Sequence, residues 1–199
     1  MEKKISILNN RFVIQVSGPD NVEFLNNILT SNVSKLSPKE IFPSALLTPQ
    51  GKILFDIITF VSKENNQIIY LECGKEQKEE LIKKLRLYSL RQNVKIIESD
   101  LITLVTNDLE NFKYIKRDKR FYKTNIGRIY LKKEEFDKKA MNHFTDDIFW
   151  YQHEKIKNCV LEGENEIPTN KIYPFEIGMH LNKGISFEKG CFIGQEVIA

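Results

Sequence analysis

Two β-rich runs joined by a short polar connection constrain the fold of this chain most strongly. Residues 53–61 and 67–72 are rich in branched and aromatic side chains, and a lysine, a glutamate and two asparagines lie between them. Such a connection suits a hairpin, in which neighbouring strands run antiparallel. Period-two or branched patterns predict further strands at residues 11–17, 93–97, 101–106, 114–115 and 127–131.

Helical patterns separate these strands. A Gly-Pro pair ends the first strand, and Asp20 and Glu23 after it have capping-box spacing, which predicts the start of a helix. Residues 76–88 place apolar side chains on one helical face and opposite charges four residues apart. Another helix is expected at residues 134–144. Because a strand–strand–helix–strand order recurs in both halves, we expect an α+β protein with antiparallel sheet.

The composition is that of an ordinary globular protein. Of the 199 residues, 41% are hydrophobic and 29% are charged, which excludes collagen-like, disordered and disulfide-scaffold classes. Thirty basic and 27 acidic residues give a net charge of +3, and this near balance gives little reason to expect nucleic acid. No apolar run approaches the ~20 residues that cross a bilayer, so no membrane partner is expected. The first nine residues resemble neither a signal nor a transit peptide, which predicts a cytoplasmic protein.

Cysteine and histidine spacing argues against a resident metal. The chain has three cysteines, no Cys-x-x-Cys pair, and three histidines without ligand spacing, so we expect no metal site. Phosphate-loop and dinucleotide-binding glycine motifs are also missing from the sequence. Cys73 and Cys159 occur among apolar or helical positions, and we expect both to be inert core thiols.

A basic strip covers residues 113–123, where six lysines and arginines alternate with three aromatic residues. An RNA-binding module could use such a strip for phosphate contacts and base stacking. The interpretation that we favour is a solvated hairpin edge whose lysines discourage edge-to-edge pairing. We therefore expect no direct nucleic-acid partner.

Residues 189–196 place a thiol between two glycines and beside a lysine, just before a stretch that could open a helix. A helix N-terminus and a nearby cation both favour the thiolate, which would make Cys191 a reactive thiol. A tight turn that happens to contain a small residue explains the same pattern. On the residues alone, both interpretations stay open.

This octapeptide resembles the signature Lys-Gly-Cys-Tyr/Phe-x-Gly-Gln-Glu of the YgfZ family, through Lys189, Gly190, Cys191, Phe192, Gly194, Gln195 and Glu196. The resemblance continues at residues 16–33, 47–53 and 88–94 and is thin from 108 to 149. YgfZ-like proteins are folate-binding relatives of the glycine-cleavage T-protein, an aminomethyltransferase. The resemblance implies interlocked, ferredoxin-like antiparallel subdomains around a folate pocket, which we place at residues 1–105 and 106–199. The family usually continues into a C-terminal β-barrel, which we expect to be absent here.

The same resemblance implies a function. It points to a folate-binding accessory protein that supports assembly or repair of iron–sulfur clusters in client enzymes, including enzymes that thiolate tRNA. The cofactor would be tetrahydrofolate or a one-carbon derivative. The cluster would belong to the client, which agrees with the missing Cys-x-x-Cys pair.

Four residues are expected to bind the folate. Asp56 would hydrogen-bond the pterin, Trp150 or Tyr151 would stack on a flat ring, and Lys155 would meet the negative glutamate tail. The register of the resemblance does not decide between Trp150 and Tyr151. We expect the octapeptide to line the rim of the same cavity, between the two halves of the chain.

Two departures from the related sequences bear on the chemistry. The T-protein has an adjacent acidic pair where this chain has Phe55 and Asp56, so we expect no true aminomethyltransferase, although that activity is the alternative function. Lys157 and Cys159 stand where relatives tend to have glutamate and glycine, which changes one wall of the expected folate site.

Overall fold

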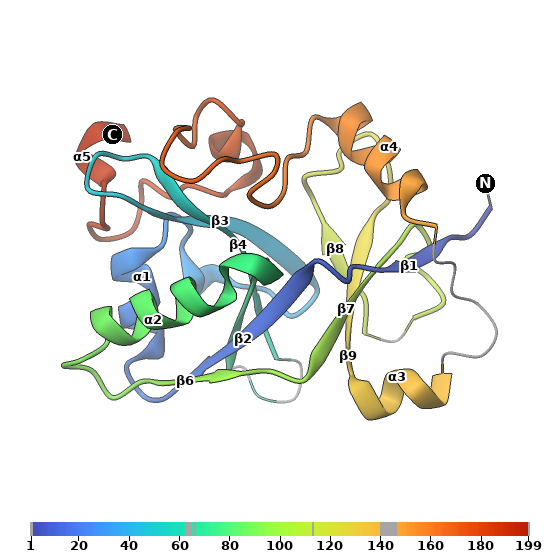
Figure 1. The fold of residues 1–199 in the computed structure, drawn as a ribbon, viewed down its shortest axis with the longest axis horizontal. Coiled ribbons are helices and arrows are strands. Elements are labelled where there is room, and N and C mark those ends of the chain that lie inside the picture. Colours follow the sequence, from blue (N-terminus) through green and yellow to red (C-terminus); the bar gives the residue numbers. More distant parts are fainter. Residues whose placement is uncertain (1, 63–64, 66, 113, 140–146, 199) are drawn as a thin grey trace.

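A single mixed sheet organises the computed structural model, which describes residues 2–62, 65, 67–112, 114–139 and 147–198 (Figure 1). Nine strands lie in the order β1-β7-β9-β8-β3-β4-β5-β2-β6 within these residues. Every pair is antiparallel except β3 with β8, which join the two parts of the sheet in parallel. The strands are β1 (Ile5–Ile7), β2 (Arg11–Ser17), β3 (Glu40–Leu47), β4 (Ile53–Val61), β5 (Ile69–Gly74), β6 (Lys95–Glu98), β7 (Leu101–Thr106), β8 (Lys116–Asp118) and β9 (Gly127–Lys132).

Short helices cover the sheet at its two ends. Figure 1 shows α1 and α2 beside β2, β4 and β6, with α3 and α4 around β7 and β9. The α-helices are α1 (Asn21–Ile28), α2 (Lys78–Tyr88), α3 (Lys133–Lys139), α4 (Phe149–Asn158) and α5 (Gln195–Ile198). The 3-10 turns are η1 (Val33–Lys35), η2 (Lys75–Gln77) and η3 (Met179–Asn182). The fold is therefore the α+β class that the sequence predicts.

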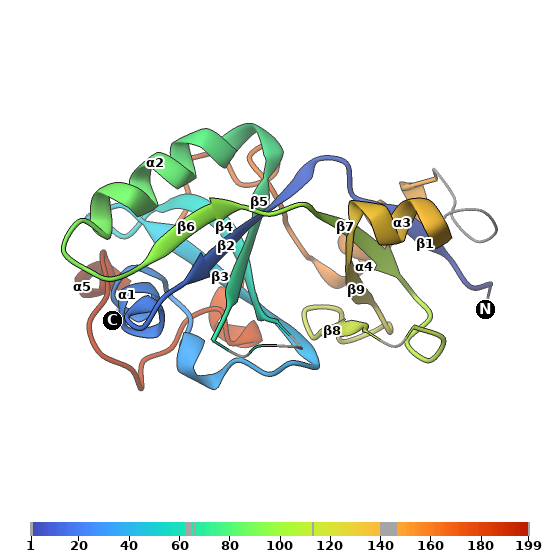
Figure 2. The same cartoon turned by 90° about the horizontal axis from the view of Figure 1, so that it is seen from below.

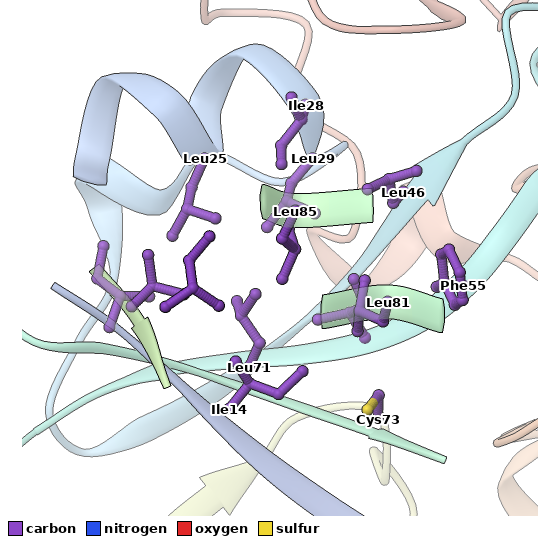
Figure 3. Packing of buried hydrophobic residues seen from close by; sticks show 14 of the residues in the cluster. Ile14, Leu25, Ile28, Leu29, Leu46, Phe55, Leu71, Cys73, Leu81 and Leu85 are labelled. Carbon is purple, nitrogen blue, oxygen red and sulfur yellow. The ribbon is translucent and has the colours of Figure 1, made fainter. Parts of the chain in front are cut away.

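The largest apolar cluster fills the layer between the sheet and the helices α1 and α2. Leu25 from α1 and Leu81 and Leu85 from α2 point toward Ile14 and Leu71 on the strands (Figure 3). All five side chains are fully buried. Each such burial stabilises the fold by about 1.5–3 kcal/mol. Figure 2 shows α2 running along this part of the sheet, as its single apolar face requires.

Local patterns predicted most elements within one or two residues. The strands at 11–17, 53–61 and 101–106 have the expected bounds, and the hairpin of β4 and β5 is confirmed. The predicted strand at 114–115 is wrong, because Tyr114 lies in a turn and pairing starts at Lys116. The expected division after residue 105 falls within β7, which pairs with both β1 and β9, and the two subdomains stay a prediction.

Two helix predictions need correction. Asp20 makes no side-chain cap for α1, because its carboxylate instead accepts a hydrogen bond of 2.7 Å from the backbone N–H of Asn93. The helix expected at 134–144 is α3, which begins one residue earlier, and residues 140–144 lie outside the described residues. The central strand β3 and the helix α4 were not predicted.

Residues 160–198 form mostly irregular chain along one side of β3 and β4 (Figure 1). The backbone N–H of Ile53 donates to Ile172, and the carbonyl of Ile53 accepts from Asn170, so this segment is tied to the start of β4. Further along, α5 lies beside the turn between β3 and β4. One continuous segment therefore runs from the end of α4 to the β3–β4 turn.

Candidate functional site

Two hollows are lined by residues of α4. The first, the inner cavity, has a volume of about 500 Å³ and is bounded by residues 8–11, 74–77 and 162–166 and by α4. The second, the outer groove, has a volume of about 1060 Å³ and lies between α4, residues 119–122 and residues 176–182. Both volumes are within or close to the usual range of small-molecule sites.

A buried network of charges reaches the lining of the inner cavity through Arg11 and Glu162. Arg128 of β9 is fully buried and donates to Glu72 of β5 over 2.5 Å, and it also pairs with Glu162. Arg11 of β2 donates to the same Glu72 over 2.7 Å and to Asp56 over 3.3 Å. These residues come from four strands and a loop, so the network binds the two parts of the sheet together.

The protonation states in this network follow from burial and charge. Burial pushes the pKa of Glu162 upward, but the charges of Arg128, Arg120 and Arg11 outweigh it and hold this pKa well below its ordinary value. Burial raises the pKa of the Tyr151 phenol, so the neutral hydroxyl donates to Glu162 over 2.9 Å. A buried carboxylate whose negative charge is balanced by arginines in this way stays ionised and has a structural role.

Of the two aromatic candidates for the ligand, only Tyr151 lines the inner cavity. Its ring is almost completely enclosed, with Phe121 and Trp150 at 5.6 and 6.0 Å between ring centroids. Trp150 packs in the core instead, and its indole N–H donates to the hydroxyl of Ser6 over 2.7 Å. A flat ligand in the inner cavity therefore finds no open face of either ring for stacking.

The charged candidates lie closer to the cavity. Lys155 lines it and makes an ion pair of 2.5 Å with Glu166. Asp56 lies behind the wall, where its carboxylate accepts from the backbone N–H of Gly163 over 3.0 Å as well as from Arg11. The structure thus brings Tyr151 and Lys155 to one cavity and connects Asp56 to it through two residues of the wall.

Sequence reasoning missed Gln77, which also lines the inner cavity. Its side-chain amide donates to Thr169 over 3.1 Å, while its buried Oε1 has no hydrogen-bond partner among the described residues. Arg11, Glu72 and Arg128 were missed as well. The available signal was a full charge inside an otherwise apolar strand, because such a charge is rarely buried without a partner.

The octapeptide lies elsewhere and lines neither hollow. The prediction that it lines the rim of the cavity is therefore wrong. Lys189 caps the end of α1 by donating to the carbonyls of Asn26, over 2.5 Å, and Leu29. Phe192 packs in an apolar cluster with Ile53. The motif therefore anchors the C-terminal segment to α1 and the sheet.

Glycine is required at position 194 for a steric reason. Its backbone has a φ of +81°, and a Cβ there would lie 2.4 Å from the carbonyl oxygen of Thr48 and 3.1 Å from the Cα of Gly51. Glycine adopts this conformation without strain, whereas other residues do not. The close approach of Gly194 to Gly51 places the octapeptide against the turn between β3 and β4.

The burial of the three cysteines differs in part from the prediction. Cys73 is buried as expected, and burial raises its pKa to about 12. Cys159 is exposed at the end of α4, so the prediction of a core thiol is wrong. Cys191 is exposed too, and the single turn of α5 begins only at Gln195, so Cys191 does not lie at the start of a helix.

The basic strip does not form one surface. The ammonium of Lys116 is buried and donates to the carbonyl of Pro38 over 2.7 Å, and Arg120 is buried between Asp118 and Glu162. The hairpin-edge interpretation is also wrong, because β8 lies between β3 and β9. Lys113 lies outside the described residues.

Among the described residues, no group of three or more His, Cys, Asp or Glu side chains is arranged to hold a metal ion. None of the described helices is long and apolar enough to span a membrane.

Comparison with solved structures defines the class of the fold. The chain matches the crystal structure of the glycine cleavage system aminomethyltransferase T from Bartonella henselae with a TM-score of 0.58 and 17% identity, over 69% of this chain and 44% of that one. This is a glycine-cleavage T-protein fold, as the sequence predicts.

Curated sequences narrow the comparison. The chain is 27% identical to the human mitochondrial iron–sulfur cluster assembly factor IBA57, over 96% of this chain and 60% of that protein. It is 26% identical to the IBA57 homologue of Phaeosphaeria nodorum, over 97% of this chain and 50% of that protein. The chain thus spans about half to three-fifths of the length of these relatives. No family model matches the chain.

These relatives contradict the prediction of a cytoplasmic protein, because they are named as mitochondrial. That prediction rested on the composition of the first nine residues, of which Ile5–Ile7 form strand β1 of the sheet.

Proposed function

We propose that this protein assists the assembly of iron–sulfur clusters in client proteins. The observation that carries the proposal is similarity over 96–97% of the chain to proteins named as iron–sulfur cluster assembly factors. The T-protein fold is consistent with an accessory role on a scaffold shared with an aminomethyltransferase. Enzymes that thiolate tRNA are one class of client to test.

Cys191 is the residue that we assign to contact with a partner. Thiolates are the usual ligands of iron–sulfur clusters. Cys191 is exposed, while its neighbours Lys189, Phe192 and Gly194 are anchored to the rest of the fold. The exposed thiol is therefore accessible to another protein, and Cys191 does not line the inner cavity.

The test of this function is complementation. Cells depleted of their IBA57-type factor would receive this chain in the same compartment, and cluster-dependent enzyme activity and tRNA thiolation would be measured. Restoration by the unmodified chain, with loss on Cys191→Ser and none on Cys159→Ser, is the expected result. Without restoration by the unmodified chain the proposal fails, and full restoration by Cys191→Ser removes the role of the thiol.

We further propose that the inner cavity binds tetrahydrofolate or a one-carbon derivative. The unpaired Oε1 of Gln77 fits a heterocycle that presents N–H donors, as a pterin does, and Lys155 fits the carboxylate tail. Stacking does not fit, since the ring of Tyr151 is enclosed. Recognition would therefore depend on hydrogen bonds.

Calorimetric titration of tetrahydrofolate tests this cavity. One neutral hydrogen bond contributes about 0.5–1.5 kcal/mol, so Gln77→Met is expected to weaken binding by up to about tenfold. Lys84→Gln, a change on α2 outside the lining of the cavity, is the control. Absence of heat with the unmodified protein at high micromolar ligand would exclude the cofactor.

Aminomethyl transfer is not proposed. Phe55, at the position of the second acid, is buried in the main apolar cluster, so Asp56 has no acidic neighbour there.

A further inference from the structure

A groove between α1 and the end of α2 lies apart from the two hollows lined by α4. It has a volume of about 430 Å³ and shares no lining residue with the inner cavity or the outer groove. Its lining comes from α1, from the last turn of α2 and from the loop that follows. Figure 1 shows these elements at the opposite end of the molecule from α4. We call this hollow the helix groove.

Apolar side chains line the helix groove, and two of them are exposed. Leu87 is 58% exposed and Leu90 is 78% exposed. Phe24 and Ile28 of α1 line the same groove and are buried. Exposed apolar side chains that share one groove are typical of an interaction site, whereas a single exposed leucine is not.

The surroundings of the helix groove are basic. Residues 81–97 include five lysines and arginines and no acid. Within the part of the chain that the structure describes, none of the five forms an ion pair; they are Lys83, Lys84, Arg86, Arg91 and Lys95. Arg91 lines the groove and no carboxylate does, while α1 contributes one exposed acid, Glu23, outside the lining. Positive charge next to apolar surface suits a partner with acids beside an apolar face.

The loop after α2 holds the helix groove in shape. The backbone N–H of Asn93 donates to the carboxylate of Asp20, at the start of α1, over 2.7 Å. Gly18, with a φ of +114°, lies so close to the carbonyl of Asn93 that a Cβ there would collide with it. These two contacts tie the end of α2 to the start of α1. A groove that is already formed loses little conformational entropy on binding.

We propose that the helix groove is a docking site for an amphipathic helix of a partner protein, with acidic residues beside its apolar face. The apolar side chains of such a helix recur at i, i+3, i+4 and i+7 and would pack against Leu87 and Leu90. Its acids would meet Arg86 and Arg91. This surface is separate from the thiol and the cavity of the proposed function.

Two other occupants fit the helix groove less well. A helix that binds a membrane surface presents a broad apolar face, and the apolar face of α2 is buried in the main core. Single-stranded RNA stacks on open aromatic faces, and the aromatic side chain of the last turn of α2, Tyr88, is half-buried.

Fluorescence anisotropy on the full chain tests this surface with a labelled synthetic helix of about 18 residues, long enough to form in solution. The acidic probe has leucines on one face and glutamates beside them, and the basic probe has lysines in place of the glutamates. We expect the acidic probe to bind, and the basic probe to bind at least about tenfold more weakly at low salt, because like charges would face each other. Affinity for the acidic probe should fall as salt is raised.

A matched pair of variants tests the apolar contact. Leu90→Ser should weaken binding of the acidic probe about fivefold or more, because the leucine would become buried on binding. Phe149→Ser, at a side chain that is 76% exposed on α4, should leave the affinity unchanged. Both side chains are exposed in the free protein, so urea unfolding should show little change in stability.

A second matched pair tests the charges. Arg86→Gln together with Arg91→Gln should weaken binding of the acidic probe about fivefold at low salt. Lys132→Gln together with Lys133→Gln removes the same charge where β9 meets α3 and should have no such effect. All four side chains are exposed.

Three outcomes would overturn the docking site. They are absence of binding of the acidic probe at high micromolar concentration, equal affinity for the two probes, and binding that survives Leu90→Ser. Tighter binding to phosphatidylserine vesicles or to polyuridine than to the acidic probe would also overturn it and would assign the surface to a membrane or to RNA. None of these results bears on the inner cavity or on Cys191, because neither shares a residue with the helix groove.

Discussion

Replacing Arg128 by methionine tests whether the buried network holds the two parts of the sheet together. Methionine keeps much of the apolar stem and removes the guanidinium, which pairs with Glu72 and Glu162. Removing one partner of a buried ion pair costs about 3–5 kcal/mol. Glu72 retains Arg11 at 2.7 Å, and Glu162 retains Arg120 at 2.5 Å, so the loss should lie near the low end, about 3 kcal/mol.

Urea unfolding at neutral pH measures this loss, with Lys119→Gln as the control. Lys119 pairs with Glu40 over 2.6 Å at the surface, and loss of such a pair costs no more than about 1 kcal/mol. For a chain of this length, 3 kcal/mol corresponds to a fall in Tm of about 6–12 °C. If Arg128→Met destabilised no more than Lys119→Gln, the network would not be a structural clamp.

Acid provides a second check on the same variant. The pKa of Glu162 is depressed in the folded protein, so its contribution to stability is present above the unfolded value of about 4.3 and is lost as pH falls toward the folded value. Removing Arg128 raises the pKa of Glu162 in the folded protein, so ionised Glu162 contributes less to the stability of the variant and less is lost in acid. The difference in the free energy of unfolding between the unmodified protein and Arg128→Met should therefore become smaller below about pH 4.3. A difference that stays constant with pH would contradict this account.

Three other substitutions or probes follow from the geometry. Gly194→Ala should lower the free energy of unfolding by at least about 1–2 kcal/mol, measured in urea, since it adds both a positive-φ penalty and a contact of 2.4 Å with a carbonyl. Burial lowers the pKa of Lys189 to about 7, so the unfolded chain binds more protons between that value and about 10.4, and stability should rise with pH there. Lys189→Met should remove that rise in urea titrations at pH 7 and 9, and an unchanged slope would refute it. Native alkylation followed by mass spectrometry should modify Cys191 and Cys159 readily and leave Cys73 unmodified until the protein unfolds.

Elements with a strong local pattern could be predicted, whereas elements whose buried face is polar could not. Helix α2 has a single apolar face over Leu81 and Leu85, and it was predicted almost in full. Helix α4 was missed because its buried side chains include Lys155 and Asn158, which interrupt the apolar period. Strand β3 was missed because it contains a proline and is buried on both faces at its end, so no alternation is visible.

The candidate site depended on pairings that no local pattern encodes. Arg11 and Glu72 are 61 residues apart, and Arg128 and Glu162 are 34 apart, so their partners appear only when the chain folds. The octapeptide was recognisable as a motif, but its placement was wrong for a related reason. Its second glycine fits against the turn at Gly51, a contact that sequence spacing cannot show.

The separation of Cys191 from the inner cavity changes how thiol and cofactor can act together. Strand β4 and the segment from residue 162 to 192 connect the two places: Ile53 packs with Phe192, and Asp56, three residues further on, holds Gly163 at the cavity wall. A ligand that displaced residues 162–166 would displace the start of the segment 162–192, which carries Cys191 near its other end. Direct chemistry between a bound folate and Cys191 has no support in this arrangement. We expect a ligand in the cavity to alter the alkylation rate of Cys191 through this shared segment, without contact with the thiol.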